Sequence, residues 1–511
     1  MTGSSPLPIP WLVTGYTADP SGQFWTLNLR QGVTFSDGTQ FNATALKDDI
    51  QNQIFANILT SNLDRDIPGA TAYIASNHNA ANQTLFINSD GMKAVSQYSL
   101  QFNLTQADAS FISLLGTCSN NGPFSVSPSA IATNGGITFG KGNTWLVTHS
   151  AGEGPYILSS YNLATGTMVL TANQNWWGIS QLGIKLPFHQ ITVNVVNSIS
   201  AEELDLRTGA SDGMALPVTN VFDFANRTAW QSAGQLVSTI PGTTLYGPYS
   251  STEFYMFNLN SQIHTASGAI ATVQPFQNHL LVEAINEAWN ASAFIQGDLN
   301  GFGLSTTGVL MQGQIGYQPV PYVYPYNLTA AKQNIVAACK QLGCSPSNPL
   351  QIPFVSGNDQ PAELAGSLLA SSVNSLSAGI VLNYLPLQSG AKISAYLSHQ
   401  YGIYLYEFGA SFSDPVNFFE LALTKPGNVA TSTDFVNQTV TNLLDQAETT
   451  SNITQRAQLY LQIDKVVAET GLYMPVFQQV NVFVSNTDLM INPYNSLWYN
   501  DLPPIFAMAP G

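Results

Sequence analysis

Charged side chains are scarce in this chain of 511 residues, which carries 14 basic and 30 acidic residues and a formal net charge of −16. They make up 9% of the sequence, against about 25% in typical soluble proteins. Nucleic acids and anionic membrane surfaces are bound by clustered lysine and arginine, and the sequence contains no basic run. Neither class of partner is therefore expected, which leaves neutral solutes and cations.

Neutral polar groups replace the missing charges, with 43 asparagines and 89 serines and threonines. Such a composition suits an acidic exterior, because carboxylates protonate there and repulsion among the remaining charges stays small. We therefore hypothesise that the protein works at acidic pH. A stability maximum well above about pH 6, with collapse below about pH 4, would contradict this hypothesis.

Cysteine is also rare: the chain has three, and none forms a CxxC pair. We therefore do not expect a zinc cluster with thiolate ligands. Cys339 and Cys344 flank the end of an expected helix, where Gly343 has the position of the residue that stops it. A small disulfide or two free thiols are both compatible with this spacing. Cys118 has no nearby partner in the sequence and is interpreted as a lone buried thiol.

The sequence has no apolar run of 18 residues, so no segment is expected to span a membrane. Its first residues, MTGSSPLPIPWLV, lack the charged start and long apolar core of a signal peptide. We therefore expect either a cytosolic protein or a chain that begins inside a longer precursor.

Eight Asn-X-Ser/Thr sequons occur, which is close to the number that the composition would give by chance. Glycosylation of a secreted protein is one interpretation of them, and chance is the other. The candidate asparagines are Asn42, Asn82, Asn103, Asn226, Asn290, Asn327, Asn437 and Asn452.

Motifs of catalysis and nucleotide binding are missing: there is no HExxH, GxSxG, Walker A or GxGxxG, and the six histidines are isolated. A zinc hydrolase is therefore not expected, nor any metal or cofactor. Two facing carboxylates would suffice for a glycosidase, but such residues are more often exposed or cap a helix, so the protein is not expected to be an enzyme. The carboxylates considered for that role are Glu253, Glu283, Glu287, Asp414 and Glu420.

The length predicts two to four domains, and the periodicity changes along the chain. Alternating residues over 24–38 predict a strand that ends in a turn at Asp37 and Gly38, and 152–177 predicts a β-hairpin followed by an aromatic pair. Residues 60–150 show only short strand signals. Strands and helices alternate from about residue 250, which indicates an α/β region. The elements expected there are strands 254–260, 350–357, 380–387 and 403–408, and helices 275–290, 328–342, 360–378, 432–449 and 453–470.

The segment 407–420, EFGASFSDPVNFFE, contains an Asp-Pro step at Asp414 and Pro415. Aspartate before proline favours the start of a turn, because its carboxylate accepts hydrogen bonds from backbone N–H groups two residues on. We therefore interpret these two residues as a structural turn, not as a catalytic pair.

Six segments in order resemble signatures of the family 5 extracellular solute-binding proteins, which serve ABC importers of the oligopeptide, dipeptide and nickel type. Residues 25–50, WTLNLRQGVTFSDGTQFNATALKDDI, resemble the strand, turn and helix of that family. The resemblance covers nearly the whole chain, although members have a first strand and further residues before Trp11 that this sequence lacks. The other segments are 152–178, 204–213, 255–289, 324–343 and 456–477.

The resemblance implies an α/β, two-lobed periplasmic-binding-protein-like fold with mixed sheets, an extra small domain and a hinge, with the solute enclosed between the lobes. It also implies a monomer in an extracytoplasmic location, which delivers a small solute to an ABC permease and its ATPase. The expected division is residues 1–148 for the start of lobe I with the small domain, 149–253 for the rest of lobe I, 254–478 for lobe II and 479–511 for a return to lobe I.

In peptide-binding relatives, an aspartate in the loop after one strand pairs with the α-ammonium of the peptide. Ser411 holds that place here, and Phe408 holds the place of a tryptophan. An unpaired buried cation costs several kcal/mol, so the serine favours a neutral solute, and an oligosaccharide in particular. Expected ligand-binding residues are Phe408, Ser411, Tyr255, Asn258, and the aromatic pair Trp498 and Tyr499. An oligopeptide or dipeptide is the alternative within the family; a secreted glycosidase or peptidase and a surface-layer glycoprotein are remote ones.

Overall fold

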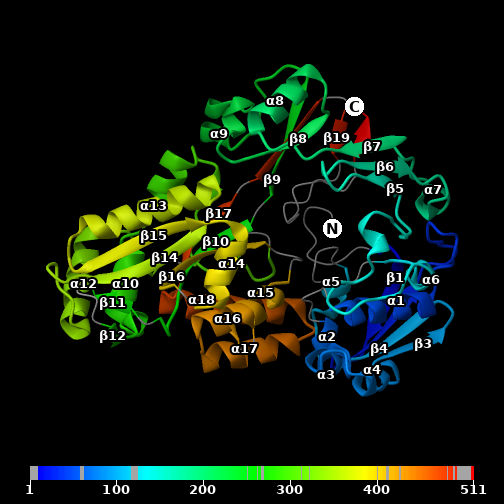
Figure 1. Ribbon diagram of the computed structural model, residues 1–511, viewed down its shortest axis with the longest axis horizontal. Helices are drawn as coiled ribbons and strands as arrows, with labels where there is room; N and C mark the ends of the chain where they lie inside the picture. Colours follow the sequence, from blue (N-terminus) through cyan, green and yellow to red (C-terminus); the bar gives the residue numbers. More distant parts are fainter. Residues whose placement is uncertain are drawn as a thin grey trace.

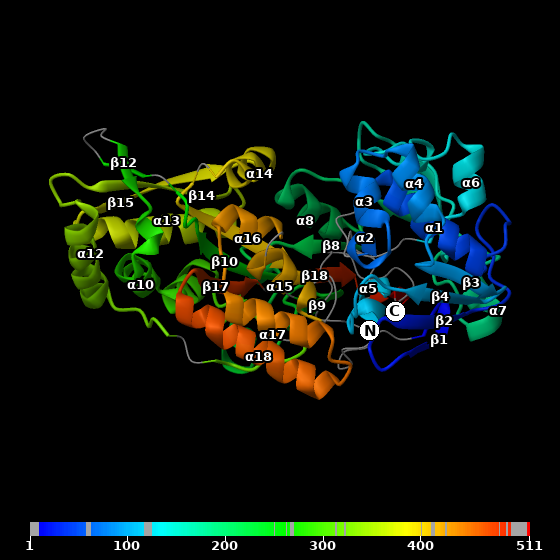
Figure 2. The ribbon, with the colours of Figure 1, turned by 90° about the horizontal axis from the view of Figure 1, so that it is seen from below.

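The protein has a two-lobed α/β architecture (Figures 1 and 2). The structure, a computed structural model, describes residues 10–57, 63–116, 125–249, 251–261, 263–265, 270–311, 314–320, 323–399, 401–409, 414–424, 427–479, 481–486, 489–491 and 508–510.

The first part of the chain folds as an antiparallel sheet covered by short helices, which we call the N-terminal unit. Its strand order is β1-β2-β4-β3, and Leu27, Leu100 and Phe102 are buried. The strands are β1 (Val13–Ala18), β2 (Phe24–Leu29), β3 (Met92–Ser96) and β4 (Ser99–Asn103); the helices are α1 (Ala43–Ala56), α2 (Leu63–Asp66), α3 (Ala70–Ala75), α4 (Ala80–Ile87), α5 (Phe111–Leu115) and α6 (Pro128–Thr133).

Two three-stranded sheets complete the same lobe, in the orders β5-β6-β7 and β8-β18-β9. Their strands are β5 (Tyr156–Tyr161), β6 (Met168–Ala172), β7 (Gln190–Val193), β8 (Gly213–Leu216), β9 (Thr243–Tyr249) and β18 (Asn481–Asn486). The helical segments beside them are η1 (Trp145–Val147), α7 (Trp177–Leu182), α8 (Ile199–Thr208), η2 (Val221–Asp223) and α9 (Arg227–Ala233), and β19 (Leu489–Ile491) pairs with β20 (Met508–Pro510).

The second lobe, which we call the large unit, is built on an eight-stranded mixed sheet. Its order is β12-β11-β14-β16-β10-β17-β13, and β15 pairs in parallel with β14. The strands are β10 (Ser251–Phe257), β11 (Ile263–Thr265), β12 (Ile270–Val273), β13 (Gly303–Leu304), β14 (Leu350–Gly357), β15 (Ile380–Leu387), β16 (Ile403–Gly409) and β17 (Tyr473–Gln479).

Helices surround the large sheet, and α15 to α18 gather beside the N-terminal unit (Figure 1, orange). Their apolar faces join the core: Phe419, Leu444 and Tyr460 belong to one continuous cluster with Leu100 and Phe111 of the N-terminal unit. The helical segments are η3 (Pro275–Gln277), α10 (His279–Glu287), α11 (Ala291–Ala293), η4 (Phe294–Asp298), α12 (Leu328–Leu342), α13 (Gln360–Ser375), α14 (Ser389–Leu397), α15 (Val416–Leu423), α16 (Asn428–Thr433), α17 (Gln438–Glu448) and α18 (Ile453–Thr470).

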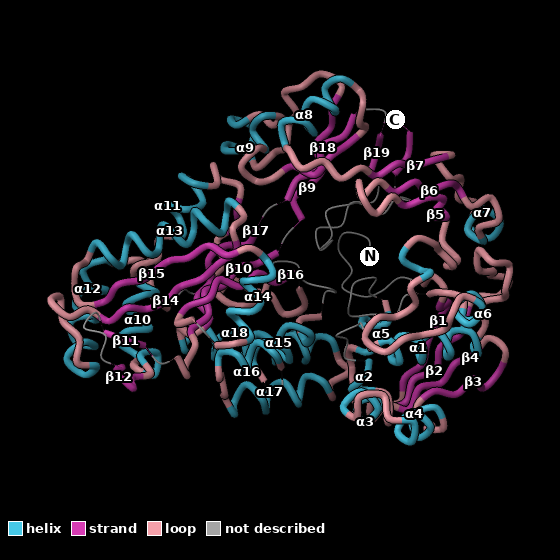
Figure 3. Tube along the Cα trace, viewed as in Figure 1, coloured by secondary structure: helices cyan, strands magenta, loops and turns pink. Residues whose placement is uncertain are grey.

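The two lobes are connected where β9 leads to β10 and where β17 leads to β18 (Figure 3). These crossings lie side by side, because Tyr249 pairs with Asn481 on one side and Thr252 pairs with Gln478 on the other. Hinges consist of a few residues in loops or at the ends of helices and strands, and both crossings lie at strand ends. The expected division of the chain at 253/254 and 478/479 stays a proposal, and the crossings occur close to both positions.

Six of the eight sequon asparagines are the N-cap residues of helices, where the side-chain oxygen accepts a backbone N–H of the first turn. Helix initiation, for which asparagine is among the preferred residues, is therefore a role for these six asparagines that does not depend on glycosylation. Whether any of the eight is glycosylated stays a prediction. The six capping residues are Asn42, Asn226, Asn290, Asn327, Asn437 and Asn452.

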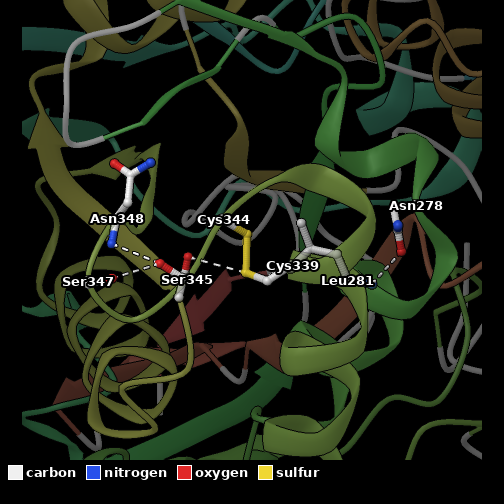
Figure 4. Close-up of a disulfide and its surroundings, with 8 residues drawn as sticks. Asn278, Leu281, Cys339, Cys344, Ser345, Ser347 and Asn348 are labelled. Carbon is white, nitrogen blue, oxygen red and sulfur yellow. Dashed lines mark hydrogen bonds between the residues drawn. A yellow bond between two sulfur atoms is a disulfide. The ribbon is translucent and has the colours of Figure 1, made fainter.

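A disulfide joins Cys339 and Cys344, with their Cα atoms 4.6 Å apart (Figure 4). It closes the end of α12 beyond Gly343, whose φ of 76° is the left-handed conformation that stops a helix. The following turn is held by paired backbone hydrogen bonds between Ser345 and Asn348. No helix within the described ranges is long and apolar enough to cross a membrane.

Candidate functional site

The carboxyl end of β16 lies at the junction of the two lobes. β16 is antiparallel to β10, and its last residues face the first residues of β10, where the chain enters from the other lobe: Ser251 pairs with Gly409 and Glu253 with Glu407. The side chain of Glu407 is exposed, and that of Tyr406 is half-buried. This strand end therefore presents a carboxylate beside the hinge.

Phe408, one of the expected ligand-binding residues, packs into the core beneath this strand end. Its ring lies 4.5 Å from that of Phe418, which lies 5.5 Å from that of Phe254. Phe408 is 8% exposed, so very little of it reaches the surface. A ligand contact for Phe408 stays a prediction, and the structure gives its ring a packing role.

Tyr255 and Asn258 are fully buried in the large unit. The ring of Tyr255 lies edge-on to those of Trp289 and Phe354. The Asn258 amide donates to the Tyr401 carbonyl at 3.0 Å and accepts from the Asn260 N–H. In this conformation both side chains are buried and serve packing and a turn. A ligand contact for Tyr255 and for Asn258 stays a prediction.

The remaining expected ligand contacts, Ser411, Trp498 and Tyr499, lie outside the described residues. Four tyrosines that the sequence analysis did not consider gather beside β16. The ring of Tyr404 lies 4.9 Å from that of Tyr396 and 6.3 Å from that of Tyr406, and Tyr401 completes the group. Alternation along the strand, which puts Tyr404 and Tyr406 on one face, is the sequence signal that points to this group.

The Asp-Pro step is a structural turn that is fixed from behind by α18. One carboxylate oxygen of Asp414 accepts from the Val416 N–H at 3.2 Å and from the Tyr460 hydroxyl at 2.6 Å. The other oxygen lies 2.9 Å from a guanidinium nitrogen of Arg456. Burial raises the pKa of Asp414, while Arg456 opposes that shift. The turn after β16 is thereby held in place by two residues that the sequence analysis did not single out.

The acids considered for a glycosidase have other roles where the structure describes them. Asp414 pairs with Arg456, and Glu420 contacts Arg65. Glu287 accepts from the Asn334 amide at 3.0 Å, and Glu283 lies 3.7 Å from His279. Among the described residues, no group of three or more His, Cys, Asp or Glu is placed to hold a metal ion.

Comparison with known proteins matches residues 8–429 to the bacterial extracellular solute-binding proteins, family 5 middle region. The probable D,D-dipeptide-binding periplasmic protein DdpA of Escherichia coli strain K12 is 23% identical over 477 residues, which cover 92% of this chain and 78% of that protein.

Solved structures share the fold. The binding protein DppA from Helicobacter pylori, in complex with the peptide STSA, has a TM-score of 0.71 at 18% identity and covers 100% of this chain and 91% of its own. The murein tripeptide-binding protein MppA of Escherichia coli has a TM-score of 0.73 at 16% identity and covers 98% and 89%. The fold is therefore that of the two-lobed periplasmic binding proteins, and with the match over most of its length this chain belongs to the family 5 bacterial extracellular solute-binding proteins.

Proposed function

We propose that this protein is the extracytoplasmic substrate-binding component of a family 5 ABC importer and that its solute is a short peptide. The observation that carries the proposal is the likeness to the probable D,D-dipeptide-binding protein, which extends over 92% of this chain. Peptide capture, the alternative in the sequence analysis, thus replaces an oligosaccharide as the leading ligand class. The protein would work as a monomer that delivers its solute to a permease and its ATPase.

A free peptide carries an ammonium group, and an unpaired buried cation costs several kcal/mol. Ser411 supplies no carboxylate for it. Glu407, four residues earlier, has an exposed side chain at the end of β16, next to the double crossing between the lobes. We assign to this carboxylate the pairing with the peptide ammonium, which makes it the substitute for the acid that the loop lacks.

A neutral oligosaccharide is the second candidate. It is favoured by the hydroxyl of Ser411 at the place of the usual acid and by the low share of charged residues, 9% of the chain. The aromatic side chains Trp498 and Tyr499 would be its stacking partners.

Isothermal titration calorimetry decides between the two solutes. The titrants are D-Ala-D-Ala, its N-acetylated form, and cello- and malto-oligosaccharides. We expect micromolar or tighter binding of the free dipeptide and at least about tenfold weaker binding of the acetylated form, because acetylation removes the ammonium charge that Glu407 would pair with. Binding of an oligosaccharide without any response to peptides would overturn the proposal.

Glu407→Gln tests the anchor separately. The variant should lose affinity for the free dipeptide and keep its affinity for the acetylated one. Glu363→Gln is the matched control, because Glu363 is an exposed carboxylate in the first turn of α13 and should affect neither titrant. If both variants bound the free dipeptide equally well, Glu407 would not be the residue that pairs with the ammonium group. The proposal that the protein binds peptides would be unaffected.

A further inference from the structure

Beside the apolar cluster that they share, the N-terminal unit and the large unit also touch at a polar contact between the α2 and α5 region and helices α15, α17 and α18. The backbone of Ala109, just before α5, is paired across it in both directions. Its N–H donates to the Glu448 carbonyl at 2.7 Å, and its carbonyl accepts from Arg456 at 3.0 Å. Since these elements belong to different lobes, we call this the interlobe contact.

Arg65 on α2 is the cation at the centre of the interlobe contact. Within its own unit it pairs with Asp66 at 2.9 Å and lies 4.0 Å from Asp108. Across the contact its guanidinium meets Glu420 of α15 and lies 3.9 Å from Glu448 of α17. A single guanidinium thus serves carboxylates of both lobes.

Arg456 on α18 is the second cation and links the contact to the turn after β16. Its guanidinium pairs with Asp414 at 2.9 Å and also donates to the Ala109 carbonyl of the opposite lobe. The same residue therefore holds the end of the candidate binding strand and the facing lobe.

Negative charge exceeds positive charge on both sides of the interlobe contact. The first lobe contributes one guanidinium and two carboxylates to the contact. The second lobe contributes one guanidinium, four carboxylates and the Tyr460 hydroxyl. When every acid is ionised, both surfaces are net negative and repel each other, and the burial of most of these groups, although not of the exposed Asp445, removes water that would screen the charges. The groups are Arg65, Asp66 and Asp108 on the first lobe, and Asp414, Glu420, Asp445, Glu448, Arg456 and Tyr460 on the second.

We propose that the interlobe contact is a proton-dependent latch, which holds the two lobes together at acidic pH and releases them as the pH approaches neutrality. The latch rests on the proposed function only in assuming that the lobes open and close about the double crossing. The latch does not depend on which solute the protein binds. Protonation of the surplus carboxyl groups removes the repulsion and leaves hydrogen-bonding groups that both sides can share.

Burial supports this direction at several of the groups. It raises the pKa of Glu448 to about 7, against the nearby charge of Arg65, and Asp108 and Asp445 raise it further. Burial and the neighbouring Asp108 also raise the pKa of Asp66 well above its ordinary value.

The sign of the pH dependence follows from where the proton is held. Opening exposes Glu448 to water, and its pKa falls back toward the ordinary value near 4.5. Between about pH 4.5 and pH 7 the closed form therefore binds more protons than the open form, so closure is favoured as the pH falls through this window. Each retained proton changes the closed-to-open ratio by up to about tenfold per pH unit.

Hydrogen exchange at the Ala109 amide measures the latch directly, because that N–H is bonded only across the interlobe contact. The measurement uses the full chain without any solute at pH 5 and pH 7. Protection at each pH is the intrinsic exchange rate divided by the measured exchange rate. We expect protection of this amide to be at least about tenfold greater at pH 5. Equal protection at the two pH values in the unmodified protein would overturn the proposal, whatever the protein binds.

Two variants separate the latch from a general effect of acid. Glu448→Gln should keep the Ala109 amide protected at pH 7, because the amide side chain cannot ionise. Glu469→Gln is the control: it removes an exposed carboxylate near the far end of α18, about 20 Å along the helix axis from Arg456, and should retain the pH dependence. If both variants kept the full pH dependence, Glu448 would not be the titrating group and the latch as proposed would be wrong.

Discussion

A single buried aspartate shows how neighbours far away in the sequence decide the role of a residue. Asp414 forms the turn that its Asp-Pro step predicts, through the Val416 N–H. Its partners on α18, Arg456 and Tyr460, lie more than 40 positions later, and nothing in the local pattern points to them. The side chain is thus both a turn residue and the buried end of an ion pair.

Asp414→Ala should destabilise the protein strongly, because it leaves the Arg456 guanidinium, which is 4% exposed, without its charge partner. Removing one member of a buried pair costs about 3–5 kcal/mol. Urea denaturation at pH 6 measures the change in the free energy of unfolding. A loss below about 1 kcal/mol would mean that the pair behaves like an exposed one.

Gly308 is a position where any side chain would collide with Asp464, whose carboxylate receives the N–H groups of Val309 and Leu310 at 2.6 and 3.1 Å. Gly308→Ala should therefore cost about 1–3 kcal/mol by forcing this loop off α18. Gly390 in α14 has no atom near an added Cβ, so Gly390→Ala should stabilise by about 0.4–1 kcal/mol. Thermal denaturation of both variants tests these two predictions, and equal changes in stability would contradict them.

At the scale of elements, asparagine is the residue that most often starts the described helices. Eight of the described helices with a side-chain N-cap hydrogen bond use asparagine, two use serine and one uses aspartate. Asparagine accepts the backbone N–H at every pH, whereas aspartate loses its charge in acid. The capping pattern therefore agrees with the hypothesis of an acidic working environment.

Asn452→Asp should reveal this advantage, because the Asn452 side chain accepts from the Thr454 and Gln455 N–H groups at the start of α18. At pH 7 the charged cap should be at least as stabilising as asparagine, through the helix dipole. Below about pH 3 it should lose about 1 kcal/mol relative to the unmodified protein. Denaturant titrations at both pH values give the difference, and a constant difference would contradict the expectation.

Elements with strong caps and long periodicity were predictable from the sequence. Helices 328–342 and 453–470 and strands 350–357 and 380–387 have the expected bounds. The expected helix 432–449 is instead two helices, because Asp434 adopts a left-handed φ of 56° and Asn437 starts a new cap. Residues 63–116 and 125–133 form the short helices α2 to α6 beside β3 and β4, and the few turns of these helices leave too little periodicity to distinguish them from strands.

At the scale of the whole molecule, the order of the family segments predicted the two lobes and the hinge. The candidate site was less predictable, because its parts come from strand register and from ion pairs between distant segments. The position of Glu407 beside the crossing between the lobes follows from the pairing of β16 with the start of β10, which the sequence does not show. Arg65 and Glu420 meet across the lobes, and no spacing in the sequence relates them.

The stability of the whole protein should increase from pH 7.5 to pH 5. Burial raises the pKa of Glu153 and of Asp464 to about 6 and that of Glu448 to about 7. Groups whose pKa is raised on folding stabilise the protein fully below their ordinary values, and this contribution is lost as the pH rises through the folded-state values. The gain should be on the order of 3 kcal/mol. A higher urea midpoint at pH 7.5 than at pH 5 would contradict this account.

The central claim is that a short peptide is captured by two lobes that close about the two crossings, from β9 to β10 and from β17 to β18. Small-angle X-ray scattering of the full chain at pH 7, with and without saturating D-Ala-D-Ala, tests it most directly. We predict a smaller radius of gyration with the dipeptide, a lesser decrease with its N-acetylated form at the same concentration, and no change with an oligosaccharide. An unchanged radius with every peptide, together with compaction by an oligosaccharide, would contradict the claim.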